Sequence, residues 1–147
     1  VMLNERPEKL SIVVFSGDFD KIHYALVMAS AATAIDIPAT LFFTMGASRA
    51  LLASPENAWR YLPGGESSKS EEKGSDVDKK YKKRTVATFE ELLQACVSLG
   101  VKFMICDMGL RAMGLEGEAL RGDVSFETGG MVTFLNDARE NGQMVFI

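Results

Sequence analysis

The chain has 147 residues, of which 47% are hydrophobic and 24% are charged, and its formal net charge is −4. This composition is that of an ordinary globular domain and excludes wholesale disorder, while the negative charge argues against general nucleic-acid binding by net attraction. With two cysteines and one histidine, the chain has neither a disulfide framework nor a Cys/His zinc cluster, so we expect no metal site.

The N-terminal residues and the apolar runs indicate in which part of the cell the protein is expected. Residues 1–9 are polar and mixed in charge, without the apolar centre of a signal peptide. The longest apolar stretch, residues 22–35, is interrupted by polar residues and is shorter than the roughly 20 residues that cross a bilayer. We therefore expect a soluble, cytoplasmic protein without a membrane span, whose thiols are reduced.

The first predicted elements are a strand and a helix. Residues 10–15 form a short apolar run rich in β-branched side chains, which is typical of a buried strand, and residues 16–18 follow as a turn. Residues 21–35 are rich in alanine and contain no proline or glycine, so they predict a helix. Asp18 or Asp20 is placed to cap it.

A second strand completes a βαβ unit. Pro38 breaks the helix, and the apolar residues 39–44 predict the strand. Residues 45–47 form a turn, and residues 48–52 are expected to begin a short helix. Strand, helix and strand joined by short links imply a parallel sheet.

The composition then changes to polar, small and charged residues. The segment from 60 to 84 holds eight Lys or Arg and five Asp or Glu, a surplus of three positive charges that leaves −7 on the rest of the chain. Because residues 64–84 have almost nothing to bury, we predict a flexible charged excursion from a single domain that spans residues 1–147.

A helix and a third strand follow. Thr88 and Glu91 have the spacing of a capping box, and the helix that they begin ends at Gly100. Residues 101–105 predict the strand, which leads directly to Cys106.

The C-terminal third predicts three shorter elements after a turn or short helix at residues 109–114. Residues 123–126 are a weak strand, residues 130–141 a helix closed by glycine, and residues 144–147 a last apolar strand. The five strands alternate with helices, so we predict an α/β fold, a three-layer α/β/α sandwich around a five-stranded, mainly parallel sheet.

Ligands of such sheets gather at the carboxyl ends of the strands. Three turns are expected there, at residues 16–21, 44–48 and 106–111. The candidate binding residues in and beside these turns are Ser16, Gly17, Asp18, Lys21, His23, Thr44, Met45, Gly46, Asp107, Met108 and Gly109.

Cys106 is the candidate catalytic residue. It directly follows a strand, near a helix start where backbone N–H groups favour a thiolate, and we expect its sulfur at a solvent-reachable edge of the sheet. The alternative is a buried, inert cysteine. Cys96 lies on the apolar stripe of its helix, so we predict a packing role. His23 could exchange a proton near neutral pH or be a satisfied structural residue.

Four stretches, taken in order along the chain, resemble the DsrE/DsrF-like sulfur-carrier family, in particular its stand-alone DsrE-type members. They are residues 15–21, residues 40–46, residues 106–108 with 113–114, and residues 129–135 with 146–147. The resemblance implies a parallel α/β fold, self-association as trimers or hexamers, and transport of sulfane sulfur on the cysteine that matches Cys106. Position 48 is serine here, so no second thiol is available in the turn after the second strand.

Two functions stay open at this point. The first is a sulfurtransferase-like persulfide relay through Cys106, which needs no metal or organic cofactor and has rhodanese-like or TusA-like sulfur carriers as implied partners. The second is a non-catalytic oligomeric module that binds a small molecule or a protein, with Cys106 lining its pocket. Whether the chain is an enzyme therefore depends on the first hypothesis. A flavodoxin-like nucleotide site is disfavoured because the chain has no phosphate-binding loop.

Overall fold

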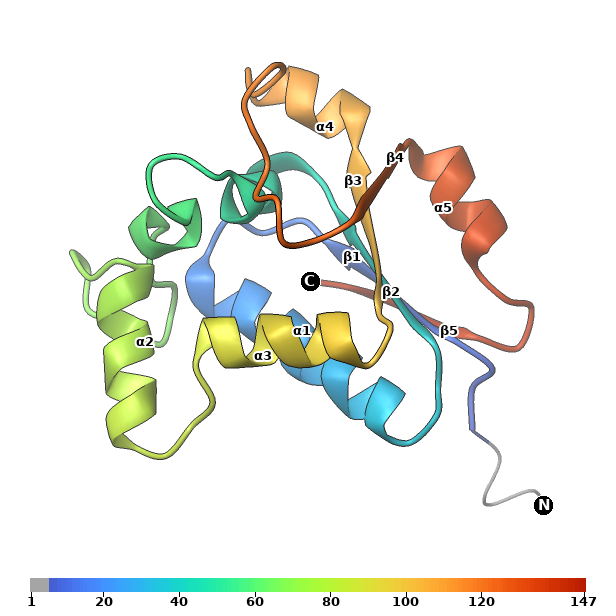
Figure 1. The fold of residues 1–147 in the computed structure, drawn as a ribbon, viewed down its shortest axis with the longest axis horizontal. Coiled ribbons are helices and arrows are strands. Elements are labelled where there is room, and N and C mark those ends of the chain that lie inside the picture. The colour runs from blue at the N-terminus through green and yellow to red at the C-terminus, as the bar shows by residue number, and fades with distance from the viewer. Residues whose placement is uncertain (1–5) are drawn as a thin grey trace.

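The computed structural model describes residues 6–147, which contain one five-stranded sheet (Figure 1). Its order is β4-β3-β2-β1-β5, and every pair of neighbouring strands is parallel. The strands are β1 (Leu10–Val14), β2 (Ala39–Phe43), β3 (Lys102–Cys106), β4 (Phe126–Gly129) and β5 (Gln143–Phe146). The predicted α/β fold with a parallel sheet is confirmed, with β1, β2 and β3 at its centre.

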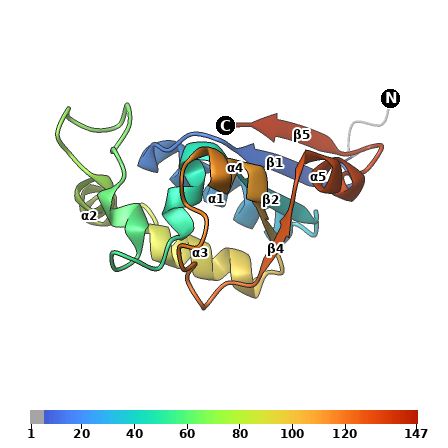
Figure 2. The ribbon, with the colours of Figure 1, turned by 90° about the horizontal axis from the view of Figure 1, so that it is seen from above.

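Helices cover both faces of this sheet. α1 and α3 lie side by side on one face, whereas α5 packs on the other (Figures 1 and 2). The helices are α1 (Phe19–Ala34), α2 (Gly74–Lys83), α3 (Phe89–Ser98), α4 (Asp107–Ala112) and α5 (Met131–Asp137), with short 3-10 helices η1 (Met45–Leu51) and η2 (Ala58–Tyr61). The two helical layers are unequal, because α5 is far shorter than α1.

Alternate residues of the central strands divide between two cores. Ile12 and Val14 join the large core beneath α1 and α3, whereas Val13 between them points to the opposite face. The small core on that face consists of Val13, Phe42, Met104, Cys106 and Phe134. Burial on both faces explains why these strands read as continuous apolar runs rather than alternating ones.

The predicted N-terminal cap is confirmed at α3 and is wrong at α1. At α3 the predicted capping box is present, since Thr88 Oγ1 accepts the N–H of Glu91 and the Glu91 carboxylate accepts the N–H of Thr88, each at 3.3 Å. At α1 the predicted acidic cap is absent, because the Asp18 side chain makes no cap hydrogen bond. Asp20 instead accepts the N–H of Ser67 at 3.0 Å and holds a distant loop.

Residues 64–84 contain more structure than their composition predicts. Their second half forms α2, in which Val77 is fully buried in the large core and Tyr81, four residues later, packs against it. Asp78 accepts the N–H of Phe89 at 2.8 Å and joins α2 to the start of α3. The prediction that this segment has almost nothing to bury is therefore wrong for α2, whereas its flexibility stays a prediction.

The C-terminal helix is shorter than predicted and ends at Asp137 instead of residue 141. The Asp137 carboxylate accepts hydrogen bonds from Lys9 Nζ, from Thr40 Oγ1 at 2.6 Å and from Lys102 Nζ at 2.6 Å. Ala138 then adopts extended backbone. Because these partners hold the carboxylate at the amino ends of β1, β2 and β3, α5 ends at Asp137.

The same contacts set the ionisation of Asp137. Burial alone raises the pKa of Asp137, but the hydrogen bonds from two lysines and a threonine outweigh it and lower the pKa to about 2. Lys9, one of these partners, is itself only 6% exposed. The network therefore pairs buried charges and ties α5 to the sheet.

We predict that Asp137→Asn lowers the free energy of unfolding at pH 7 by about 3 kcal/mol, because it leaves the Lys9 ammonium buried without its anionic partner. The folded pKa of Asp137 lies below its unfolded value of about 3.9. Its stabilising effect is therefore present above that value and is lost as the pH falls towards the folded pKa of about 2. Urea unfolding of both proteins from neutral to acidic pH should show their difference shrinking on acidification.

Glu127→Gln is the matched control, because exposed Glu127 contacts the same Lys102 ammonium at 3.7 Å. A surface pair of this kind is worth less than about 1 kcal/mol. Equal losses in the two variants would contradict the role of Asp137 as a buried anchor.

Candidate functional site

The carboxyl ends of β1, β2 and β3 are neighbours, so the turns that follow them meet at one edge of the sheet. A Cβ atom on Gly46 would lie 3.1 Å from the backbone nitrogen of Gly17. A Cβ on Gly109 would lie 2.6 Å from Thr44 Oγ1 and 2.7 Å from the backbone nitrogen of Met45. The backbones of the three turns therefore pack directly on one another, which leaves no room for a side chain at position 109.

Cys106 lies at this edge, at the end of β3. It is the last residue of β3, pairs in register with Gly129 of β4, and occupies the N-cap position of α4. Its Sγ accepts a hydrogen bond from the backbone N–H of Gly109 at 3.3 Å. A donor aimed at sulfur stabilises negative charge there, as a thiolate or a persulfide anion requires.

The Cys106 thiol is buried in the single chain. Its exposed fraction is 3%, because its side chain points to the face of the sheet that α5 covers and joins the small core with Phe42 and Phe134. The Phe134 ring is fully buried and stacks on Phe42 with ring centroids 4.8 Å apart. The prediction of a solvent-reachable sulfur is therefore wrong for this arrangement, since Cys106 lies within the small core beneath α5.

The residues that follow the cysteine face the solvent. Met108 is 57% exposed, and the Asp107 carboxylate accepts the N–H of Met108 at 2.9 Å. Asp107 also contacts Arg111 at 3.7 Å on the next turn of α4. This part of the predicted site thus presents one apolar and two charged side chains beside the buried thiol.

Cys96 contrasts with Cys106. It lies in the large core with no exposed surface, and its thiol contacts the carbonyl oxygen of Leu26 at 3.5 Å. Burial raises the pKa of the Cys96 thiol to about 12, so the thiolate is scarce at neutral pH. The predicted packing role is confirmed.

The first predicted turn is occupied with its own contacts. Ser16 Oγ accepts the N–H of Asp18 at 3.1 Å, and the Asp18 carboxylate contacts Lys21 Nζ at 3.5 Å. The backbone of Gly17 packs against that of Gly46, so this turn lies beside the edge of the sheet that carries Cys106. The Lys21 ammonium is directed to Asp18 and to the flank of α1 rather than to the thiol.

His23 is separated from Cys106 by the sheet. Its ring packs with Phe19 and Tyr81 on the α1 side, and Nε2 donates to the carbonyl oxygen of Ala87 at 2.8 Å. The side chain is 4% exposed. His23 therefore cannot exchange a proton directly with the Cys106 thiol, although the two residues were predicted as parts of one edge.

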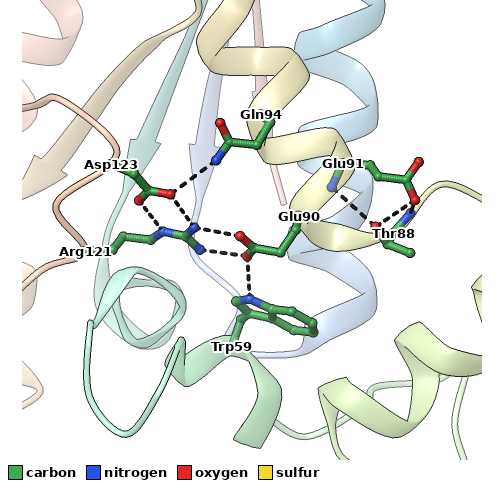
Figure 3. A network of polar contacts seen from close by, with 7 residues as sticks. All are labelled: Trp59, Thr88, Glu90, Glu91, Gln94, Arg121 and Asp123. Carbon is green, nitrogen blue, oxygen red and sulfur yellow. Dashed lines mark hydrogen bonds and ion pairs between the residues drawn. The ribbon is translucent and has the colours of Figure 1, made fainter.

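An ion network around the buried Arg121, which the sequence did not reveal, fastens the connection between α4 and β4 (Figure 3). Arg121, only 5% exposed, donates two hydrogen bonds to Glu90 of α3, at 2.8 and 2.7 Å, and two more to Asp123, both at 2.8 Å. Trp59 Nε1 donates to the same Glu90 carboxylate at 2.8 Å. The hydrogen bonds from Arg121 lower the pKa of Glu90. No spacing rule links residues so far apart, so only the fold could show this network.

Of the side chains at the carboxyl ends of the strands, the Cys106 thiol is the one with distinctive chemistry. Among residues 6–147, no three His, Cys, Asp or Glu side chains are grouped so that they could hold a metal ion. In the same part of the chain, every helix is too short or too polar to cross a bilayer.

Comparisons with known proteins agree with this architecture. A sequence model of the DsrE/DsrF/DrsH-like family matches residues 67–146, which is more than half of the chain. The uncharacterized protein YrkE of Bacillus subtilis (strain 168) is 28% identical over 162 aligned positions, covering 99% of this chain and 100% of YrkE.

Two solved structures share the fold. The ychN protein from E. coli aligns with a TM-score of 0.54 and 15% identity, over 95% of this chain and 97% of its own. MTH1491 from Methanobacterium thermoautotrophicum aligns with a TM-score of 0.55 and 13% identity, over 95% and 98% of the two chains.

Proposed function

The chain belongs to the DsrE/DsrF/DrsH-like family, as its sequence predicted, and from that premise we propose that it carries sulfane sulfur as a persulfide on Cys106. The observation that carries the proposal is the backbone N–H of Gly109 directed at Cys106 Sγ, at the carboxyl end of a central strand. Cys96, the other thiol, is sealed in the large core and unsuited to exchange.

The proposed reaction is a sulfur exchange without net oxidation. The Cys106 thiolate attacks the outer sulfur of a donor persulfide, R–S–SH, so that a bond forms between Sγ and that sulfur. The S–S bond of the donor breaks, its electron pair leaves with R–S⁻, and the product is Cys106–S–SH. An acceptor thiolate then attacks the outer sulfur in the same way and restores the Cys106 thiolate.

The burial of Cys106 requires a step that uncovers it. We assign this step to α5, which is seven residues long and contributes a single fully buried side chain, Phe134, to the small core. So few buried contacts allow local opening at a lower free energy than unfolding of the whole chain. The N-terminal end of α5, after Gly129 and Gly130, is the end nearer to Cys106, because Gly129 pairs with Cys106.

Exposed apolar side chains on the same face support self-association. They are Met108 of α4, Met131, Val132 and Leu135 of α5, and Met144 and Phe146 of β5. The last two point to the α5 face, since they pair in register with Ser11 and Val13 of β1. We propose that further copies of the chain cover this face in a trimer or hexamer, with rhodanese-like or TusA-like proteins as sulfur donor and acceptor in the reducing cytoplasm.

The persulfide proposal predicts a mass gain of one sulfur atom per chain after treatment with polysulfide, reversed by dithiothreitol. Cys106→Ser should abolish the gain, because its hydroxyl can keep the hydrogen bond from Gly109 but cannot hold sulfane sulfur. Cys96→Ala should retain it. Intact-mass spectrometry measures this, and an adduct that persists in Cys106→Ser, or none on the wild-type protein, would favour the non-catalytic module.

The opening step predicts that Phe134→Leu raises the rate of Cys106 alkylation by iodoacetamide about tenfold, since trimming a buried aromatic ring weakens the cover by more than about 1 kcal/mol. Phe103→Leu is the matched control, because Phe103 is as buried but lies on the opposite face of β3. The same acceleration in both variants would show general loosening and contradict a role for α5.

Self-association predicts that sedimentation velocity shows three or six chains per particle. Val132→Glu should shift the particle towards monomer, because Val132 is 73% exposed on α5 and a charge there opposes burial of the apolar face. Val86→Glu, on the α1 side of the molecule and 43% exposed, should leave the particle unchanged. A monomeric wild-type protein at high micromolar concentration would contradict the proposal.

A further inference from the structure

A cavity of about 620 Å³ lies on the flank of α1, on the side of α2 and away from Cys106. Its walls come from α1, α2, residues 66–67, Val86 and the end of the chain at Ile147. Pockets that hold small molecules in proteins commonly have volumes of 300–1,000 Å³. No residue of the small core around Cys106 contributes to it, so it is independent of the proposed sulfur chemistry.

The walls of this cavity are mainly apolar and aromatic. Val27, Val86 and Ile147 provide aliphatic surface, while Tyr24 and Tyr81 provide aromatic surface. The Tyr81 ring also packs against His23, with ring centroids 4.8 Å apart. A flat, largely apolar molecule is the shape and chemistry that such walls bind best.

His23 supplies an unused hydrogen-bond acceptor in the wall. Because a carbonyl oxygen can only accept, the contact at 2.8 Å with Ala87 places a proton on Nε2. In the neutral ring, Nδ1 then carries a lone pair that the contact with Ala87 leaves free. The side chain is 96% buried and fixed by its neighbours, so this acceptor is held in place beside the cavity.

The charged groups around the cavity disfavour an anion. Among the described residues that line the cavity, Asp20 and Glu66 contribute two carboxylates and Lys21 one ammonium, which also contacts Asp18 at 3.5 Å. Asp20 accepts the N–H of Ser67 and so fixes the loop at the rim. The surplus of negative charge favours a neutral or cationic ligand.

From these observations we infer that the cavity binds a small aromatic molecule that is neutral or cationic and carries an O–H or N–H donor. The ring lies between Tyr81 and the aliphatic side chains, and the donor bonds His23 Nδ1. The chain thus has a second functional site, for a ligand of phenol or arylamine type, on the face of the sheet opposite Cys106.

The test uses the full chain labelled with ¹⁵N and three probes that share a benzene ring with oxygen and alkyl substituents in para positions: 4-ethylphenol, 4-ethylanisole and 3-(4-hydroxyphenyl)propionate. We expect saturable amide shifts near Tyr81 and Val86 with 4-ethylphenol. Loss of one hydrogen bond in the anisole should weaken binding about fivefold to tenfold. The anionic probe should also bind more weakly than 4-ethylphenol.

Two valine variants distinguish binding in this cavity from binding elsewhere on the surface. Val27→Trp fills the cavity and should abolish the shifts, whereas Val97→Trp, at an exposed position of α3, should keep them. No saturable shifts with 4-ethylphenol, or unchanged binding in Val27→Trp, would overturn the site. Equal affinity for phenol and anisole would overturn the role of His23, and tighter binding of the anionic probe would overturn the inferred charge of the ligand.

Discussion

The unequal covering of the sheet is the constraint on which the rest of the structure depends. The carboxyl ends of three adjacent parallel strands carry the turns of the candidate site, and alternation along β3 directs Cys106 to the face opposite α1 and α3. That face is covered by one short helix through Phe134. A cysteine in this position is shielded from water, yet only a small part of the molecule must move to expose it.

Buried charges hold the parts that surround the thiol. Asp137 joins the far end of α5 to the amino ends of the central strands through two lysines and a threonine. Arg121 joins the segment after α4 to α3 through Glu90. Since each pair lies away from Cys106, α5 can stay attached at its C-terminal end while its other end moves, as the proposed opening requires.

Local sequence patterns predicted the elements well, because their causes are local. The Thr88–Glu91 spacing gave the start of α3, and apolar runs gave β1, β2, β3 and β5. The strand predicted at residues 123–126 overlaps β4 only at Phe126, because β4 is an edge strand without an apolar run of its own. Contacts between distant residues were not predictable. Val77 and Tyr81 attach α2 to the large core although the composition of this segment predicts a solvated chain, and Asp137 shortens α5 through partners far away in the sequence. His23 and Cys106 were grouped because both follow strands closely, but strand alternation and helix phase place them on opposite faces.

The central claim is that the Cys106 sulfur receives and releases sulfane sulfur. Cyanide removes sulfane sulfur as thiocyanate, so cyanolysis of polysulfide-treated, desalted protein counts the transferable atoms. One thiocyanate per chain from the wild-type protein, and none from Cys106→Ser, is the result expected here. No thiocyanate from either protein, or equal amounts from both, would contradict the account.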